Sequence, residues 1–244
     1  MGSRKPWAQP VQDRLADRHG HFHEIRRHVE ELSKSEQHNT AEIGPFVAIS
    51  RELGASGCEV ANRLGQMLGW RVLDREMLEF IANQFSLDRE MLTMLDEDSL
   101  SWFGESVLSL IHPHLLSQDE YLARLIKVVV VTLAGSPGIV VGRGAHIFLP
   151  RHRGLGVRII ADEGDRLARL QKERNLDAKA AQRAMQDTDA ARRSFVKHHF
   201  HRDVADPLAY DLVVNTSQLG IDGAVAIIAA ACRARGLAGD DHSR

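Results

Sequence analysis

The sequence FVAISRELGASGCEVANRL, residues 46–64, decides the fold of this chain. Residues 46–49 are apolar and typical of a short buried strand, which stops at a loop that contains Gly54 and Gly57. Apolar residues then recur with helical period, at Val60, Leu64, Met67 and Leu68. A strand, a tight loop and a helix in this order aim backbone N–H groups and the positive end of a helix dipole at one point, which suits a phosphate group.

The loop departs from the P-loop pattern GxxxxGK[ST]. With Gly57 as the last glycine of that pattern, Glu52 replaces the first glycine, Cys58 the lysine and Glu59 the serine or threonine. The loop therefore lacks the lysine that neutralises the β- and γ-phosphates and the hydroxyl that binds Mg²⁺. A glycine-rich turn without any ligand is the other interpretation, because such turns are common in α/β folds.

The composition is that of a soluble globular protein. Of 244 residues, 43% are hydrophobic and 26% are charged. The formal net charge of −2 gives no basic field for nucleic acid, and no apolar run is long enough to cross a membrane. The two cysteines match no disulfide or zinc spacing, and residues 1–21 lack the apolar segment of a secretory signal. We expect a cytoplasmic protein that binds neither nucleic acid nor membrane.

Alternating strands and helices predict a parallel sheet with helices on both faces. Strands are expected at 46–49, 70–74, 138–141, 156–160 and 211–216, and helices at 57–68, 162–172, 176–202 and 221–234. The run of valines at 128–131 favours a strand by propensity, but we assign it to a helix in a mostly helical region, 75–135, because parallel strands need a crossover between them.

Two further strands end in candidate ligand groups. Asp74 closes one strand, where a carboxylate faces the ligand crevice of a parallel sheet, although capping the helix that follows would explain it equally well. Arg143 stands between Gly142 and Gly144 at the end of another strand, where its guanidinium group is suited to grip a phosphate. Their common position at strand ends favours a single site.

Asp189 and Arg192 are three residues apart in the predicted helix 176–202 and share a face. Such a pair can hold a ribose hydroxyl and a phosphate, but spacing alone favours an ion pair on an exposed surface. The nearby histidines at 198, 199 and 201 lack the spacing of metal ligands on one helical face, so no metal site is predicted.

The ends of the chain differ from its centre. Residues 1–44 are polar and histidine-rich, with a thin apolar stripe over 11–35, and we predict a helical extension that packs weakly on the body or binds a protein partner. Residues 96–114 form an acidic and polar insertion, with the composition of either a flap over a site or a surface excursion. The domain is expected to span 45–235, and residues 236–244 to form a disordered tail.

Four stretches together resemble the cytidylate kinase-like proteins of the nucleoside monophosphate kinase group. They read ISRELGASGCEVANRLGQMLGWRVLDREML at 49–78, VVGRGAHIFL at 140–149, VRIIADEGDRLARL at 157–170, and DAARRSFVKHHF with DPLAYDLVVNTSQLG within 189–220. They occur in the family's order with similar gaps, over about 46 to 234. The resemblance implies a three-layer αβα P-loop NTPase fold with a five-stranded parallel sheet, a helical lid and a monophosphate-binding insertion between the second and third strands.

The resemblance also implies the site. ATP would be held with its Mg²⁺ by the loop residues Gly54, Ala55, Ser56, Gly57, Cys58 and Glu59. Arg143, Asp189 and Arg192 would hold the nucleoside monophosphate, CMP or dCMP, with Asp74 near the reacting phosphates or the acceptor. Arg166 and Arg169 fall where arginines of the lid approach the donor.

The chain departs from true cytidylate kinases in the loop and in the turn. Cys58 and Glu59 replace the lysine and threonine of the loop, and Gly144 replaces the acid that follows the arginine of the turn. Arg51 is the nearest substitute for the missing cation. Three hypotheses follow: a kinase for nucleoside monophosphates, a catalytically impaired nucleotide-binding protein with a regulatory role, and a kinase for a different small acceptor.

Overall fold

The computed structural model describes residues 27, 43–79, 81 and 120–239. Five parallel strands form one sheet in the order β2-β3-β1-β4-β5. The strands are β1 (Phe46–Arg51), β2 (Arg71–Leu73), β3 (Gly138–Val141), β4 (Gly154–Ile160) and β5 (Leu212–Asn215). Each of the predicted strands is present, with ends shifted by a residue or two. The predicted helix within 1–44 and the insertion at 96–114 lie outside the described residues.

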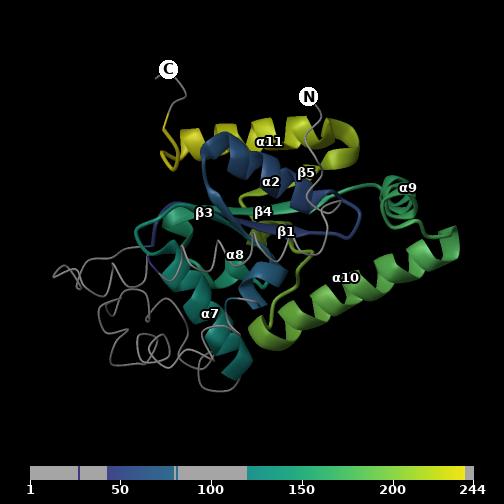
Figure 1. Ribbon diagram of the computed structural model, residues 1–244, viewed down its shortest axis with the longest axis horizontal. Coiled ribbons are helices and arrows are strands. Elements are labelled where there is room, and N and C mark those ends of the chain that lie inside the picture. The colour runs from purple at the N-terminus through teal and green to yellow at the C-terminus, as the bar shows by residue number, and fades with distance from the viewer. Residues whose placement is uncertain (1–26, 28–42, 80, 82–119, 240–244) are drawn as a thin grey trace.

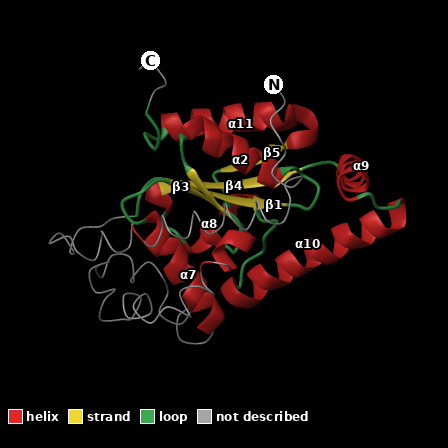
Figure 2. Cartoon of the chain, in the orientation of Figure 1, coloured by secondary structure: helices red, strands yellow, loops and turns green. Residues whose placement is uncertain are grey.

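Helices cover both faces of the sheet (Figures 1 and 2). On one face lie α2 (Gly57–Leu68) and α11 (Thr216–Ala234), and on the other α7 (Glu120–Leu133), α8 (Ala145–Phe148) and α10 (Ala178–Phe200). Short 3-10 turns cover Arg151–Arg153 and Pro207–Ala209. The three-layer αβα architecture is therefore confirmed.

Side chains of the central strand alternate between two hydrophobic cores. Val47 and Ile49 pack into the core shared with α2 and α11, whereas Phe46 and Ala48 pack into the core shared with α7. Strands buried on both faces read as continuous apolar runs, which explains why residues 46–49 show no polar alternation. The residues that follow this run, at the carboxyl end of β1, are not part of the hydrophobic cores and can therefore contribute to a binding site.

The valine-rich run folds as a helix, as predicted. Val128–Val131 lie within α7 and are buried, since α7 is the crossover element that packs on the sheet before β3. The hydroxyl of Thr132 donates to the carbonyl oxygen of Val128, 2.7 Å away. Burial against the sheet outweighs the modest helix propensity of valine.

A helical hairpin follows β4, and we refer to it as the lid hairpin after the helical lid that the resemblance implies. It consists of α9 (Glu163–Arg174) and α10. A small separate core joins this hairpin to the loop after β1, since Leu53 packs with Leu170, Ala181 and Met185. The loop and the hairpin are thus connected by apolar contact as well as by the polar contacts described below.

The last helix begins earlier than the sequence suggests. Helix α11 starts at Thr216 and has a non-helical residue at Gly220 (φ 66°, ψ 177°), so the predicted start at 221 corresponds to its second part. By length and composition α11 meets the minimum for a membrane span, with a mean hydropathy of 1.2, but one of its faces is buried in the core with α2. Leu237 and Ala238 pack against the same core, although the sequence predicts a disordered tail from 236.

Candidate active site

The loop after β1 has the geometry of an anion site. Gly54 (φ 80°) and Ser56 (φ 58°) both have left-handed backbone conformations, and α2 begins at Gly57. The first intrahelical bond runs from the N–H of Val60 to the carbonyl oxygen of Ser56, so the N–H groups of residues 57–59 precede the helical bonding pattern. These N–H groups and the helix dipole favour a negative ligand at this point.

The carbonyl groups of the loop are held by side chains from two other elements. Arg166 Nε of α9 donates to the carbonyl oxygen of Leu53 (2.8 Å), and Arg169 Nη1 donates to that of Gly54 (3.1 Å). Thr216 Oγ1 of α11 donates to the carbonyl oxygen of Ala55 (3.0 Å). Arg166 and Arg169, which the resemblance places among the lid arginines, therefore bind the backbone of the loop.

Asp189 connects α10 to the same loop. Its Oδ1 accepts a hydrogen bond from the N–H of Leu53 (2.9 Å) and lies 3.5 Å from Arg192 Nη1, and its Oδ2 accepts from Arg166 Nη2. The Asp189 side chain is only 13% exposed. The interpretation that spacing favoured, an ion pair on an exposed surface, is therefore wrong, because the pair packs against a loop that is remote in sequence.

Glu52 forms ion pairs with arginines of two elements, α9 and β4. Arg166 Nη1 lies 3.1 Å from its Oε2, and Arg158 Nη2 of β4 lies 3.5 Å from its Oε1. Arg158 also donates to Ser50 Oγ at 3.1 Å and lies over the ring of Tyr210. The residue in place of the first P-loop glycine thus links the lid to the centre of the sheet.

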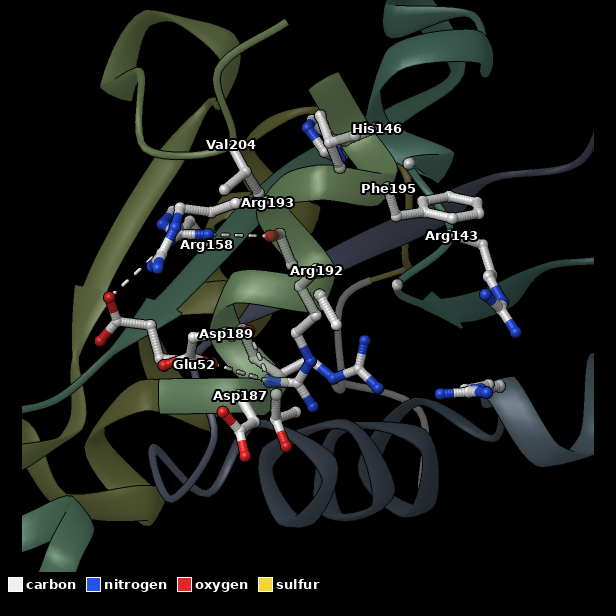
Figure 3. Close-up of a pocket in the computed structure, with 18 residues that line it drawn as sticks. Glu52, Arg143, His146, Arg158, Asp187, Asp189, Arg192, Arg193, Phe195 and Val204 are labelled. Carbon is white, nitrogen blue, oxygen red and sulfur yellow. Dashed lines mark hydrogen bonds and ion pairs between the residues drawn. The ribbon is translucent and has the colours of Figure 1, made fainter. Parts of the chain in front are cut away.

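Arg51, Arg143 and Arg192 line one cavity of about 510 Å³. Figure 3 shows Arg143 and Arg192 among the residues that line it. Two of the three arginines come from the ends of β1 and β3, and the third comes from α10. The charged residues of the lining are six arginines and three acids: Arg51, Arg75, Arg143, Arg158, Arg192 and Arg193, with Glu52, Asp187 and Asp189. This excess of positive charge makes the cavity an anion-binding site in electrostatic terms.

Arg51 and Arg192 lie close together, with the carboxylate of Asp189 3.5 Å from Arg192 Nη1. Arg192 Nη1 donates to the carbonyl oxygen of Arg51 at 3.0 Å. Burial, followed by the charge of Arg51, lowers the pKa of Arg192 to about 10. The Nε of Arg51 is buried and has no hydrogen-bond partner among the described residues. An anion between these guanidinium groups would relieve their repulsion.

Arg51 also connects the cavity to the loop. A Cβ on Gly57 would lie 2.6 Å from the Cβ of Arg51, and a Cβ on Gly142 would overlap with Arg51 Nη1. The side chain of Arg51 therefore runs from the start of α2 to the turn after β3, and both glycines leave room for it. Of the described residues that line the cavity, none belongs to 54–59.

The turn after β3 fixes Arg143. Gly142, Arg143 and Gly144 all have positive φ, and a Cβ on Gly144 would overlap with the ring of Phe200. This overlap is a physical reason for glycine where cytidylate kinases carry an acid. The Arg143 guanidinium lies 5.6 Å from the ring centre of Tyr121 and 5.2 Å from that of Phe195. Its burial lowers its pKa.

A carboxylate for Arg143 comes instead from Glu79, which sequence reasoning missed. Glu79 Oε1 accepts from Arg143 Nη2, from Arg75 Nε (3.0 Å) and from the hydroxyl of Tyr121 (3.1 Å). The i,i+4 spacing of Arg75 and Glu79 was the available signal, but it does not reveal contacts with residues over 40 positions away.

Seven predicted site residues lie apart from the cavity lining, namely Asp74 and the loop residues 54–59. Asp74 caps the helical turn after β2, since its Oδ1 accepts from the N–H of Met77 at 2.8 Å. Glu59 pairs with Arg63 one turn along α2, at 2.9 Å, and Cys58 is exposed. The cavity also includes His146, which is buried, stacks on Tyr210 at 4.5 Å and was not predicted.

The sheet order, the loop before α2 and the lid hairpin define a P-loop kinase fold. The chain belongs to the cytidylate kinase-like family, whose family model matches residues 46–218. No curated protein matches the chain in sequence.

The chain is similar to solved structures at low sequence identity. An uncharacterised protein from Eubacterium ventriosum ATCC 27560 is 17% identical, with a TM-score of 0.56 over 78% of this chain and 98% of that chain. Shikimate kinase from Acinetobacter baumannii, in complex with shikimate, is 16% identical, with a TM-score of 0.38 over 79% of this chain and 95% of that chain.

Proposed function

We propose that this protein transfers the γ-phosphoryl group of ATP to a nucleoside monophosphate, CMP or dCMP. The observation that carries this proposal is the meeting of Arg51, Arg143 and Arg192 at one cavity beside the start of α2. A transferring phosphoryl group needs cations on the acceptor side and on the donor side at once. Membership of the cytidylate kinase-like family supports the same reaction class.

We assign the donor side to the loop and to Arg51. The loop 54–59 would hold the phosphates of ATP, with the N–H groups of residues 57–59 as donors, while Arg51 would supply the positive charge that a P-loop lysine supplies elsewhere. Burial leaves the Arg51 Nε without a protein partner in the described residues, which suits this role. Arg166 and Arg169 would keep the loop in its binding shape through their bonds to Leu53 and Gly54.

We assign the acceptor side to Arg143 and Arg192. The acceptor is already an anionic phosphate oxygen, so the reaction needs alignment and charge neutralisation and no strong general base. Asp189 would act by holding the loop and Arg192, and Asp74 by capping the turn that carries Arg75. Both are positioning residues in this proposal.

Mg²⁺ would enter with ATP. Among the described residues, no three potential metal-ligating side chains lie together, and Glu59 is paired with Arg63. We propose that the ion is held by the phosphates of the nucleotide, where it supplies positive charge between the β- and γ-phosphoryl groups. The ligands are then small nucleotides, and we expect a cytoplasmic protein whose residues 1–44 could receive a protein partner.

A coupled assay of ADP release over a panel of ribo- and deoxyribonucleoside monophosphates tests the proposal. ATP and CMP binding should be measured on the same sample by calorimetry. Turnover with CMP or dCMP above the rate of ATP hydrolysis alone is the expected result. Absence of turnover with every nucleoside monophosphate would contradict the proposal.

A second candidate is a nucleotide-binding regulatory protein without efficient catalysis. Cys58 and Glu59, in place of the lysine and hydroxyl residue, favour it. Binding of ATP and CMP without turnover would support this candidate. The variant Cys58→Lys separates the two, because a large gain in rate would show that the missing cation limits the chemistry, whereas a fully active wild type would gain little.

A further inference from the structure

One oxygen atom of Glu79 receives hydrogen bonds from three elements of the fold. Arg75 belongs to the same helical turn, Tyr121 to α7 and Arg143 to the turn after β3. Three donors, two of them cationic, are more than a single carboxylate oxygen needs for hydrogen bonding. A convergent set of this kind is typical of a site for an oxyanion.

The charges of this cluster do not balance. Burial would raise the pKa of Glu79, but the hydrogen bond from Arg75 and the charge of Arg143 outweigh it, and its pKa is lowered. The carboxylate is therefore ionised at neutral pH, so the cluster holds one negative charge against two positive ones. Arg143 keeps a buried Nε with no hydrogen-bond partner among the described residues. A phosphate dianion would neutralise the two cations more fully than the carboxylate does.

Arg143 is buried more deeply than Glu79, whereas Arg75 and Tyr121 lie at the exposed side of the cluster. The side chain of Arg143 is 12% exposed and lies between the rings of Tyr121 and Phe195. That of Glu79 is 32% exposed, and its flexible chain can rotate away from the cluster toward solvent. Arg75 and Arg143 both line the cavity of the active site.

We propose that Arg75, Tyr121 and Arg143 form a phosphate subsite, in which the carboxylate of Glu79 occupies the place of the acceptor's phosphate until that phosphate displaces it. The proposal rests on the proposed function only where it identifies the displacing group as the phosphate of a nucleoside monophosphate. Glu79 then sets the affinity of the site for phosphate by competing for the same donors.

The variant Glu79→Gln tests this competition, because it keeps the shape of the side chain and removes its charge. Binding of inorganic phosphate and of CMP to the full chain should be measured by calorimetry, with the melting temperature as a check on folding. Both ligands are expected to bind about tenfold more tightly than to the wild type. Asp222→Asn is the matched control, since Asp222 pairs with Arg63 at 2.6 Å on the outer surface and should leave affinity unchanged. Weaker or unchanged phosphate binding by a folded Glu79→Gln variant would overturn the proposal.

A second substitution in the Glu79→Gln background identifies the donors. Arg75→Gln in that background should weaken phosphate binding about tenfold. With the Glu79 carboxylate removed, Arg75 no longer forms its ion pair, so its loss affects only the contact with phosphate. An unchanged affinity would remove Arg75 from the subsite and overturn its composition.

The outcomes also separate this inference from the proposed function. Turnover with CMP in the wild type, combined with no gain in phosphate affinity for Glu79→Gln, would refute the competition and leave the kinase proposal intact. The gain in phosphate affinity without turnover of any nucleoside monophosphate would refute the kinase proposal and support the subsite.

Discussion

At the scale of single residues, Arg51 carries the main departure from a standard P-loop kinase. It lies beside Gly57 and Gly142, and burial, followed by the charge of Arg51, lowers the pKa of Arg192. We predict that Arg51→Ala weakens ATP binding and lowers kcat/KM about 100-fold or more, which is roughly 3 kcal/mol of lost transition-state stabilisation. Calorimetry and the coupled ADP assay measure the two effects. Arg183→Ala is the control, since this exposed arginine of α10 lies outside the cavity. Unchanged ATP affinity and turnover in Arg51→Ala would remove Arg51 from the site.

Gly144 is a second residue whose role can be isolated. It has φ 71°, and an added Cβ would overlap with the ring of Phe200. Gly69 has a similar φ of 67° but has nothing within 4 Å of an added Cβ. We predict that Gly144→Ala destabilises the protein by about 3 kcal/mol and Gly69→Ala by only about 1 kcal/mol. Urea unfolding measures the free energy of unfolding of both variants. Equal losses would show that the strain of a positive φ accounts for the whole effect and that the overlap with Phe200 adds nothing.

At the scale of elements, the lid hairpin is connected to the phosphate loop through Leu53. Its N–H donates to Asp189, its carbonyl oxygen accepts from Arg166, and its side chain packs with Leu170 and Met185. These contacts join the loop and the hairpin into one unit, so we expect them to open together.

Removal of Asp189 should disconnect that unit. We predict that Asp189→Ala increases hydrogen exchange at the amide of Leu53 at least tenfold, because the N–H loses its acceptor, and raises exchange in the facing part of α10. Mass spectrometry of exchanged peptides measures both. Asp187→Asn, an exposed position on the same helix, should leave exchange at Leu53 unchanged. Protection that persists at Leu53 in Asp189→Ala would show that the apolar contacts suffice.

Elements could be predicted from this sequence better than the contacts between them. Apolar runs and glycines locate β1, the loop and α2, since their signals lie within a few residues of one another. The contacts of Asp189 with Leu53 and of Glu79 with Arg143 span 136 and 64 residues. No local pattern encodes such pairs, so the spacing of Asp189 and Arg192 suggested an exposed ion pair and Glu79 was not considered.

At the scale of the whole molecule, the cavity lies beside one of the hydrophobic cores. On the face of α7, α8 and α10, buried apolar residues extend from Phe46 to Phe200, and polar residues of the cavity follow β1 and β3 at their carboxyl ends. The hydrogen bonding and protonation state of buried polar groups at this boundary affect the free energy of unfolding. His146 is the clearest case, because it is 8% exposed and lines the cavity.

The protonation of His146 makes global stability depend on pH. Burial, followed by the charges of Arg158 and Arg151, lowers the pKa of His146 from 6.5 to about 4. Between these pH values the unfolded chain binds a proton at His146 that the folded protein does not. The free energy of unfolding is therefore unaffected by the protonation of this histidine above pH 6.5 and decreases as the pH falls toward 4. We predict that this residue accounts for roughly 3 kcal/mol of the free energy of unfolding that is lost over that range.

Urea unfolding at about pH 7 and about pH 4.5 should therefore show a smaller loss of stability in His146→Gln than in the wild type. His152→Gln, at an exposed position, should keep the wild-type slope. Parallel pH profiles for the wild type and His146→Gln would show that His146 accepts its proton in the folded protein.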